Sequence, residues 1–278
     1  MPTLYVVATP IGNLEDLTLR ALRVLGEVGL IAAEDTRVTR QLLSRYEIKT
    51  PLTSYHEHNK TSKLPSLLDK LSEMDLALVS DAGVPGINDP GYELVQAAAQ
   101  AGVEVVTVPG PSAVTAAIAV SGLPLEGFVY LGFLPRRKTE RRRLLESVAA
   151  ETRALVAFET PHRLSASLTD FLTALGDRQI AVCRELTKLH EEVFRGTVSG
   201  SIGHFTEPRG EFTLVIEGNS DQAVQPSAEE TKALLDQLRK AGIGAKEAVA
   251  RASEGSGLSR REVYRLWLET RGASGGDP

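Results

Sequence analysis

The chain has one cysteine, Cys183, among its 278 residues. A single thiol forms no intramolecular disulfide and builds no cysteine-rich metal site, so we expect a reducing compartment, the cytoplasm. No apolar run approaches the roughly 20 residues of a membrane-spanning helix, and the amino terminus lacks the basic segment and cleavage site of a signal peptide. The sequence therefore predicts that the protein has no membrane partner.

Two phosphate-binding signatures are missing as well. The chain contains no G-x-x-x-x-G-K-[ST] motif, and the loop after its first predicted strand lacks the G-x-G-x-x-G spacing. Both motifs place glycines where the backbone must approach a phosphate closely. Their absence argues against a P-loop nucleotidase and against a standard dinucleotide-binding enzyme.

An excess of positive charge is also absent from the chain as a whole. It holds 31 Lys and Arg against 36 Asp and Glu, a formal net charge of −5, with 42% hydrophobic residues. This composition is typical of a packed globular protein. The charge is uneven, however, because residues 1–125 carry 9 basic and 14 acidic side chains, whereas residues 136–146 carry 6 basic and 2 acidic. Charges interact over only about 8 Å at physiological ionic strength, so a phosphate responds to this local basic excess.

Short apolar runs alternate with segments of helical periodicity in the first half. Strands are predicted at residues 4–8, 76–79 and 103–108, with helices near residues 17–26 and 92–101. Strands joined by crossover helices form a mostly parallel sheet. We therefore expect an α/β domain over residues 1–124.

The second half of the chain is predicted to contain two further domains. Further strands at residues 128–134, 154–158, 180–183, 193–198 and 212–216 predict a second α/β domain over residues 125–219. Residues 218–227 are polar and read as a linker. Three short helices are expected over residues 226–271, followed by a frayed tail from residue 272.

Three glycine- and proline-containing loops each follow a predicted strand of the first domain: TPIGN (9–13), SDAGVPGINDPG (80–91) and PGPS (109–112). Ligands bind at the carboxyl ends of parallel strands, so we expect these loops to converge there. Asp81, at the end of its strand, is the acid expected to face a ligand. Asp89 precedes Pro90, a pattern that favours capping of the next helix.

The following blocks carry a family resemblance: LYVVATPIGNLEDLTLRAL, AAEDTRVTRQLL, SYHEHN, SDAGVPGINDPG, VPGPSAVTAAIAVSGLP and FETPHRL. In this order they resemble the ribosomal RNA small subunit methyltransferase I family, within the tetrapyrrole methylase superfamily. The element SDAG-x-P-x-x-x-DPG is a specific signature of that family. The resemblance covers nearly the whole chain.

The resemblance implies a two-domain class III methyltransferase fold with a helix-turn-helix-like carboxy-terminal appendage. It implies a homodimer that uses S-adenosylmethionine to methylate the ribose 2′-hydroxyl of a cytidine in the decoding region of 16S rRNA. The residues matching cofactor contacts of relatives are Pro10, Ile11, Asp81, Val84, Ser112, Ala113, Phe158, Glu159, Leu186 and Thr213.

Two other functions stay open at this point. One is methylation of a small tetrapyrrole of the precorrin type, although the first loop, TPIGN, departs from the glycine-rich loop of that branch. The other is a non-enzymatic regulator whose terminal helices bind nucleic acid.

Alcohols are weak nucleophiles, so a carboxylate that removes the ribose proton would assist the reaction. The candidates are Glu34, Asp35 and Glu159, with helix capping as the alternative role of Asp35. His56 and His58 lack a clear third ligand, and no metal site is predicted.

Clustered basic residues contact phosphates independently of sequence, although a solvated helix face is the other interpretation. The RNA-binding candidates are Arg37, Arg136, Arg137, Lys138, Arg141, Arg142 and Arg143.

Overall fold

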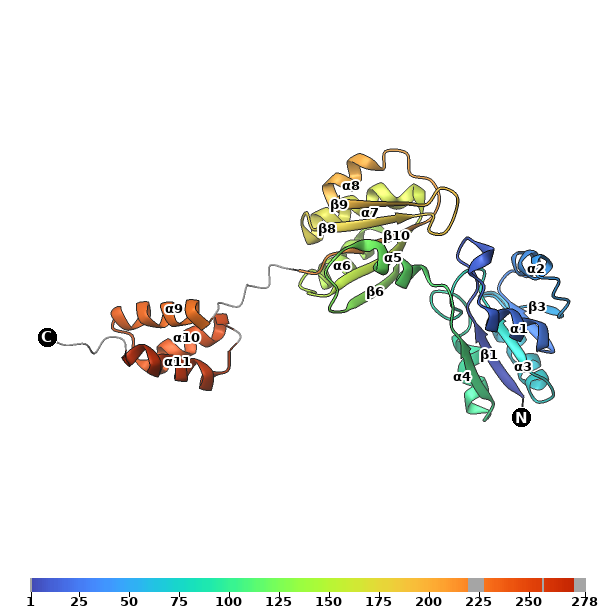
Figure 1. The fold of residues 1–278 in the computed structure, drawn as a ribbon, viewed down its shortest axis with the longest axis horizontal. Coiled ribbons are helices and arrows are strands. Elements are labelled where there is room, and N and C mark those ends of the chain that lie inside the picture. Colours follow the sequence, from blue (N-terminus) through green and yellow to red (C-terminus); the bar gives the residue numbers. More distant parts are fainter. Residues whose placement is uncertain (1, 220–227, 257, 273–278) are drawn as a thin grey trace. The chain divides into compact units, whose positions relative to one another are not determined.

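The computed structural model describes residues 2–219, 228–256 and 258–272. The chain divides into two compact units, Met1–Gly218 and Asn219–Pro278. The first unit contains two five-stranded sheets, and the described part of the second contains helices (Figure 1). The α/β class predicted from the alternation of apolar runs and helical segments is confirmed.

The first sheet has the strand order β3-β2-β4-β1-β5, and every pair in it is parallel. Its strands are β1 (Thr3–Val7), β2 (Leu30–Ala33), β3 (Leu52–Ser54), β4 (Leu76–Val79) and β5 (Glu104–Val108). The connecting helices are η1 (Leu14–Asp16), α1 (Leu19–Glu27), α2 (Thr36–Arg45), α3 (Lys60–Leu71) and α4 (Tyr92–Gln100).

Helices cover both faces of this sheet. Ala77 and Val79 of β4 pack with α1 and α2 in one apolar cluster. Leu76 and Leu78, which alternate with them along the strand, pack with α3 and α4 in another. Because both faces are buried, the strand appears in the sequence as an uninterrupted apolar run.

The second sheet has the order β6-β7-β10-β8-β9, in which β6 and β7 are parallel and the other pairs antiparallel. Its strands are β6 (Phe128–Phe133), β7 (Ala154–Glu159), β8 (Gln179–Arg184), β9 (Glu192–Thr197) and β10 (Phe212–Ile216). Its helices are α5 (Ala113–Ser121), α6 (Lys138–Ser147), α7 (Pro161–Leu175) and α8 (Val198–His204).

Helix α5 connects the two sheets. It follows β5 of the first sheet, yet Val114 and Ala117 pack against β7, β8 and β10 of the second. Helices α6, α7 and α8 cover the opposite face, where Leu145, Leu168 and Phe171 are fully buried. The predicted boundary at residues 124 and 125 stays a prediction.

The second unit has its own apolar core. Its helices are α9 (Ala228–Lys240), α10 (Ala245–Ser256) and α11 (Arg260–Gly272), and Leu235, Ala248 and Val263 are fully buried among them. Residues 220–227 of the predicted linker and 273–278 of the predicted tail lie outside the described residues. Among the helices that are described, none is long and apolar enough to cross a membrane.

Candidate active site

The loops that follow β1 and β4 are joined to each other by main-chain hydrogen bonds. The Thr9 amide donates to the Gly83 carbonyl at 2.9 Å, and the Gly83 amide donates to the Thr9 carbonyl at 3.0 Å. Strands β1 and β4 are neighbours in the sheet, so their carboxyl ends present TPIGN and SDAGVPGINDPG side by side. This is the position at which open parallel sheets bind ligands.

A cavity of about 310 Å³ opens beside these loops, at the low end of the roughly 300–1,000 Å³ of ligand pockets. Both sheets contribute to it. Nine of the ten residues that the resemblance assigned to the cofactor line it: Ile11, Asp81, Val84, Ser112, Ala113, Phe158, Glu159, Leu186 and Thr213. The tenth, Pro10, instead borders a neighbouring cavity of about 100 Å³ that it shares with Asp81.

Close packing between the first loop and the loop after β8 depends on Gly12. A Cβ atom at this position would lie 2.5 Å from Cγ of Lys188 and 2.8 Å from Oγ1 of Thr187. Glu185 and Thr187 on the facing loop have positive φ angles of 51° and 69°. Such backbone conformations are uncommon for residues other than glycine and cluster at functional sites. Here they flank Leu186, one of the cavity-lining residues.

Aromatic rings form one wall of the cavity. Phe133 and Phe158 line it, and their ring centroids lie 5.5 Å apart in an edge-to-face arrangement. Tyr130 also packs edge-to-face on Phe158, with ring centroids 5.4 Å apart. The Tyr130 hydroxyl accepts a hydrogen bond from the side-chain amide of Asn88, which belongs to the SDAGVPGINDPG loop. This bond links the loop of the first sheet to β6 of the second.

Five acidic residues line the same cavity, and the pKa values of three of them, Glu34, Asp81 and Asp89, are raised. Burial raises the pKa of Asp89 to about 6, and the nearby negative charge of Glu34 adds to the shift. Burial also raises the pKa of Glu34 and of Asp81 above their ordinary values. The Asp81 amide donates to Oε2 of Glu34 at 3.3 Å, which holds these two residues together. The cavity thus concentrates acidic groups whose charge is destabilised by burial.

Two of the predicted catalytic acids are held in other interactions. Asp35 caps α2 by accepting from the Arg37 amide at 2.8 Å, and it forms an ion pair with the Arg37 guanidinium at 2.6 Å. Hydrogen bonds from Arg37 lower the pKa of Asp35 to about 2. Glu159 is 1% exposed and accepts hydrogen bonds from the Ser167 hydroxyl and the Thr160 amide. Glu34 is the predicted acid that faces the cavity without such a local cap.

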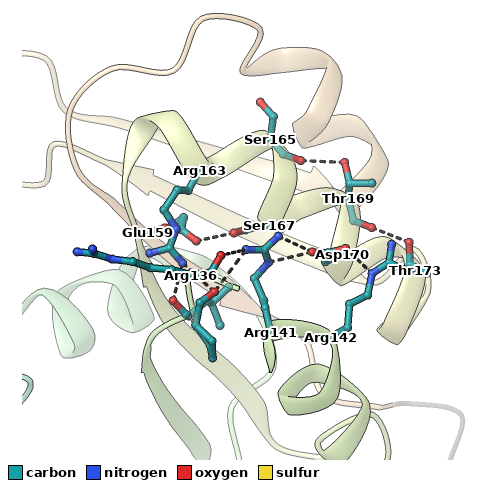
Figure 2. A network of polar contacts seen from close by, with 12 residues as sticks. Arg136, Arg141, Arg142, Glu159, Arg163, Ser165, Ser167, Thr169, Asp170 and Thr173 are labelled. Carbon is teal, nitrogen blue, oxygen red and sulfur yellow. Dashed lines mark hydrogen bonds and ion pairs between the residues drawn. The ribbon is translucent and has the colours of Figure 1, made fainter. Parts of the chain in front are cut away.

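The basic run is divided between surface and interior. Arg136, Arg137, Lys138 and Arg143 are exposed, as is Arg37 on α2. Arg141 is only 5% exposed, and its Nε and Nη2 donate to Oδ2 of Asp170 at 2.9 and 2.6 Å (Figure 2). The burial of Arg141 and its pairing with Asp170 weigh against the predicted RNA contact at this residue, because its guanidinium is enclosed between α6 and α7. Arg142 donates to Oδ1 of the same carboxylate at 2.7 Å.

Asp89 and Phe133 are among the cavity residues that the sequence did not assign to the site. Asp89 lines the cavity, and the helix that it was expected to cap has Gly91 as its cap. Phe133 ends β6 three residues before Arg136, and it is 53% exposed. The signal available in the sequence for Phe133 was an aromatic residue three positions before a basic run. Nothing in the local sequence distinguishes Asp89 from a helix cap.

Comparison with known proteins identifies the family. Residues 3–200 match the family model of the tetrapyrrole (corrin/porphyrin) methylases. The proteins named ribosomal RNA small subunit methyltransferase I from Halalkalibacterium halodurans and Synechocystis are 45% and 48% identical to this chain. These matches cover 95% and 97% of this chain and 94% and 98% of the relatives. The protein of that name from Thermotoga maritima is 53% identical, and 78% of this chain matches 99% of its length.

Solved structures support the fold. Uroporphyrin-III C-methyltransferase from Thermus thermophilus has a TM-score of 0.54 and 22% identity, covering 77% of this chain and 94% of that one. Diphthine synthase has a TM-score of 0.60 and 11% identity, and the match covers 78% of this chain and 90% of that one. The two-domain class III methyltransferase fold is thereby confirmed. Taken with the curated relatives, these matches show that the chain belongs to the ribosomal RNA small subunit methyltransferase I family of tetrapyrrole methylases.

Proposed function

We propose that this protein transfers a methyl group from S-adenosylmethionine to the ribose 2′-hydroxyl of a cytidine in the decoding region of 16S rRNA. The observation that carries the proposal is the cavity at the carboxyl ends of β1 and β4, lined by nine residues matching cofactor contacts of the family. The names of the curated relatives, 45% and 48% identical, support small-subunit rRNA as the substrate.

The cavity suits a positively charged ligand. Glu34, Asp81 and Asp89 line it, and the lysine that lines it, Lys188, forms ion pairs with Glu185 and Glu211 at 2.9 Å each. S-adenosylmethionine carries an ammonium group and a sulfonium group, so carboxylates favour it through opposite charge. When bound, it supplies an electrophilic methyl group on sulfur. The apolar side chains of Ile11, Val84 and Leu186 fit its uncharged surface.

The chain's own contribution is to orient the ribose and accept its proton. As the new oxygen–carbon bond forms, the carbon–sulfur bond breaks, leaving a neutral thioether, a methyl ether and one proton. We assign Glu34 as the acceptor of that proton, because its carboxylate lines the cavity and burial raises its pKa above the ordinary value, which makes it a stronger base. Asp35 and Glu159 are held in the cap and hydrogen bonds described above, which weighs against either acting as the base.

The exposed basic residues supply phosphate contacts in this proposal. Arg136, Arg137, Lys138 and Arg143 lie on and before α6, and Arg37 lies on α2. Phosphate contacts position RNA without reading its bases. The proposal includes a homodimer acting in the cytoplasm on rRNA or on the small ribosomal subunit. Sedimentation analysis of the purified chain tests the dimer.

Small ribosomal subunits lacking the modification, incubated with radiolabelled S-adenosylmethionine, test the function. We expect the label at a single ribose 2′-oxygen, located by mapping of 2′-O-methylation. Glu34→Gln is expected to lower the single-turnover rate about 100-fold while the dissociation constant for S-adenosylmethionine stays within about twofold. The matched control is Glu104→Gln. Glu104 is an exposed acid at the amino end of β5, whereas the cavity lies beyond the carboxyl ends of the strands, so this variant should retain the wild-type rate.

The competing functions give different results in the same assay. A tetrapyrrole methylase would label a porphyrinoid and leave the subunits unlabelled. A nucleic-acid-binding regulator would bind without consuming the cofactor. Unlabelled subunits with the wild-type protein would refute the proposed function, and an unchanged rate in Glu34→Gln would refute only the role of Glu34.

A further inference from the structure

We propose that Phe133 is a stacking platform for the base of the target nucleotide, at the mouth of the cavity; this rests on the proposed RNA methyltransferase function. Phe133 is 53% exposed although it lines the cavity. An exposed aromatic ring that lines a cavity offers its apolar face to a ligand bound there, and covering the ring would gain burial free energy. An unpaired base offers such a surface, because every base has an aromatic face.

The ring is supported from within the protein. Phe158 packs edge-to-face against it at 5.5 Å, with an angle of 61° between the ring planes. Tyr130 packs on Phe158 in turn, at 5.4 Å and 75°. Edge-to-face pairs are favourable beyond the area that they bury. Phe158 and Tyr130 are half-buried, so the exposed ring at the outer end of this aromatic series is Phe133.

The backbone after Phe133 is fixed by two arginines. Leu134 is 2% exposed, and its carbonyl accepts from Nη2 of Arg163. The next carbonyl, of Pro135, accepts from Arg163 at 3.2 Å and from Arg141 at 3.4 Å. Asp170 holds Arg141 in turn (Figure 2). A platform whose position is set before binding loses less entropy when the base stacks on it.

Positive charge follows the platform directly. Arg136, Arg137 and Lys138 are exposed, and in Figure 2 the side chain of Arg136 extends away from the buried network around Asp170. Specific recognition of RNA combines stacking of an unstacked base on an aromatic ring with basic contacts to the flanking phosphates. The target nucleotide must leave its neighbours for its ribose to reach an enclosed site. In this proposal Phe133 stacks on the base, and the basic residues that follow it contact the flanking phosphates.

The cofactor is the other ligand that presents an aromatic face, through its adenine. The RNA base is favoured for Phe133, because this ring is exposed and lies three residues before the exposed basic residues, whereas Phe158 is half-buried. The two occupants differ in one measurable respect. Loss of a base platform weakens RNA binding and leaves cofactor affinity intact.

Phe133→Ala, Phe133→Trp and Phe128→Ala, each in the full chain, test the proposal. Phe128 begins the same strand, is 40% exposed and does not line the cavity, so it is a matched control. We expect Phe133→Ala to weaken binding to unmodified small subunits about 10-fold and to lower kcat/KM at least as much. Phe133→Trp and Phe128→Ala should stay within about threefold of wild type. The dissociation constant for S-adenosylmethionine, measured by calorimetry, should be unchanged in all three.

The proposal would be overturned if Phe133→Ala bound subunits as tightly as the wild type, or if it lost affinity for S-adenosylmethionine to the same extent. It would also be overturned if Phe128→Ala weakened subunit binding equally, or if Phe133→Trp bound subunits as weakly as Phe133→Ala. Failure of the proposed function appears in the wild-type protein alone, as unmethylated subunits. Subunit binding by filter assay is measured independently of methylation, so the platform is tested in either case.

Discussion

The carboxyl group of Asp89 shows how burial changes one residue's properties. It lies in the SDAGVPGINDPG loop and faces the cavity, with Glu34 and Asp81 as acidic neighbours. Burial raises its pKa to about 6 from the ordinary value of 3.8, and a hydrogen bond from Ser80 offsets part of the shift. Perturbed carboxylates of this kind concentrate at functional sites. Burying such a charged carboxylate lowers the stability of the folded state.

We predict that Asp89→Asn stabilises the protein at pH 7.5. The pKa of Asp89 is higher in the folded than in the unfolded chain, so the folded state binds more protons between about pH 4 and 6, and stability falls as pH rises through that range. The uncharged amide avoids this loss. A melting temperature higher by about 3 °C at pH 7.5, with the difference vanishing near pH 4, is expected in calorimetry.

Glu93→Gln is the control for a general effect of removing negative charge. Glu93 forms an ion pair with Lys60 at 2.5 Å, which lowers its pKa. Its replacement should not raise the melting temperature at pH 7.5. If both variants raised the melting temperature equally, the effect of Asp89→Asn would come from removing one negative charge from the acidic residues 1–125, and not from the burial of Asp89.

At the scale of elements, one buried carboxylate joins two helices. Asp170 on α7 is 1% exposed and pairs with Arg141 and Arg142 of α6. Burial raises its pKa, but hydrogen bonds from both arginines outweigh that effect and keep the pKa below its ordinary value. The same helix places Ser167 against Glu159. Packing of α6 on α7 therefore determines which basic residues remain at the surface.

We predict that Asp170→Asn lowers the free energy of unfolding by about 3 kcal/mol, because it leaves the enclosed Arg141 guanidinium without its counter-charge. Urea unfolding monitored by circular dichroism measures this. Glu140→Gln breaks the exposed pair with Arg137 and should cost no more than about 1 kcal/mol. If both variants lowered the free energy of unfolding equally, burial of the ion pairs of Asp170 would not increase their contribution to stability.

At the scale of the whole chain, the cavity and the helical unit are separate parts. Every cavity-lining residue lies between Ile11 and Thr213, within the unit Met1–Gly218. The helical unit has its own core around Leu235 and Val263.

Ending the chain after Gly218 is expected to leave the dissociation constant for S-adenosylmethionine within about twofold of the full chain, by calorimetry. The reason is that the truncation removes no cavity residue. The separate segment 219–278 should bind no cofactor. A loss of cofactor binding in the truncated chain, with its circular dichroism unchanged, would contradict this assignment.

The sequence alone determined the alternation of strands and helices and the loops after β1, β4 and β5, whereas nine of the residues that line the cavity were implied by the family resemblance. The strands, helices and loops could be predicted because apolar periodicity and glycine or proline placement act over a few residues. The tertiary structure decided the partner of Arg141, which lies 29 residues away, the burial of Glu159, and the positions of Asp89 and Phe133 at the cavity. Whether a charged side chain meets solvent, a counter-charge or a ligand depends on which segments pack against it, and that contact is made only when distant parts of the chain come together.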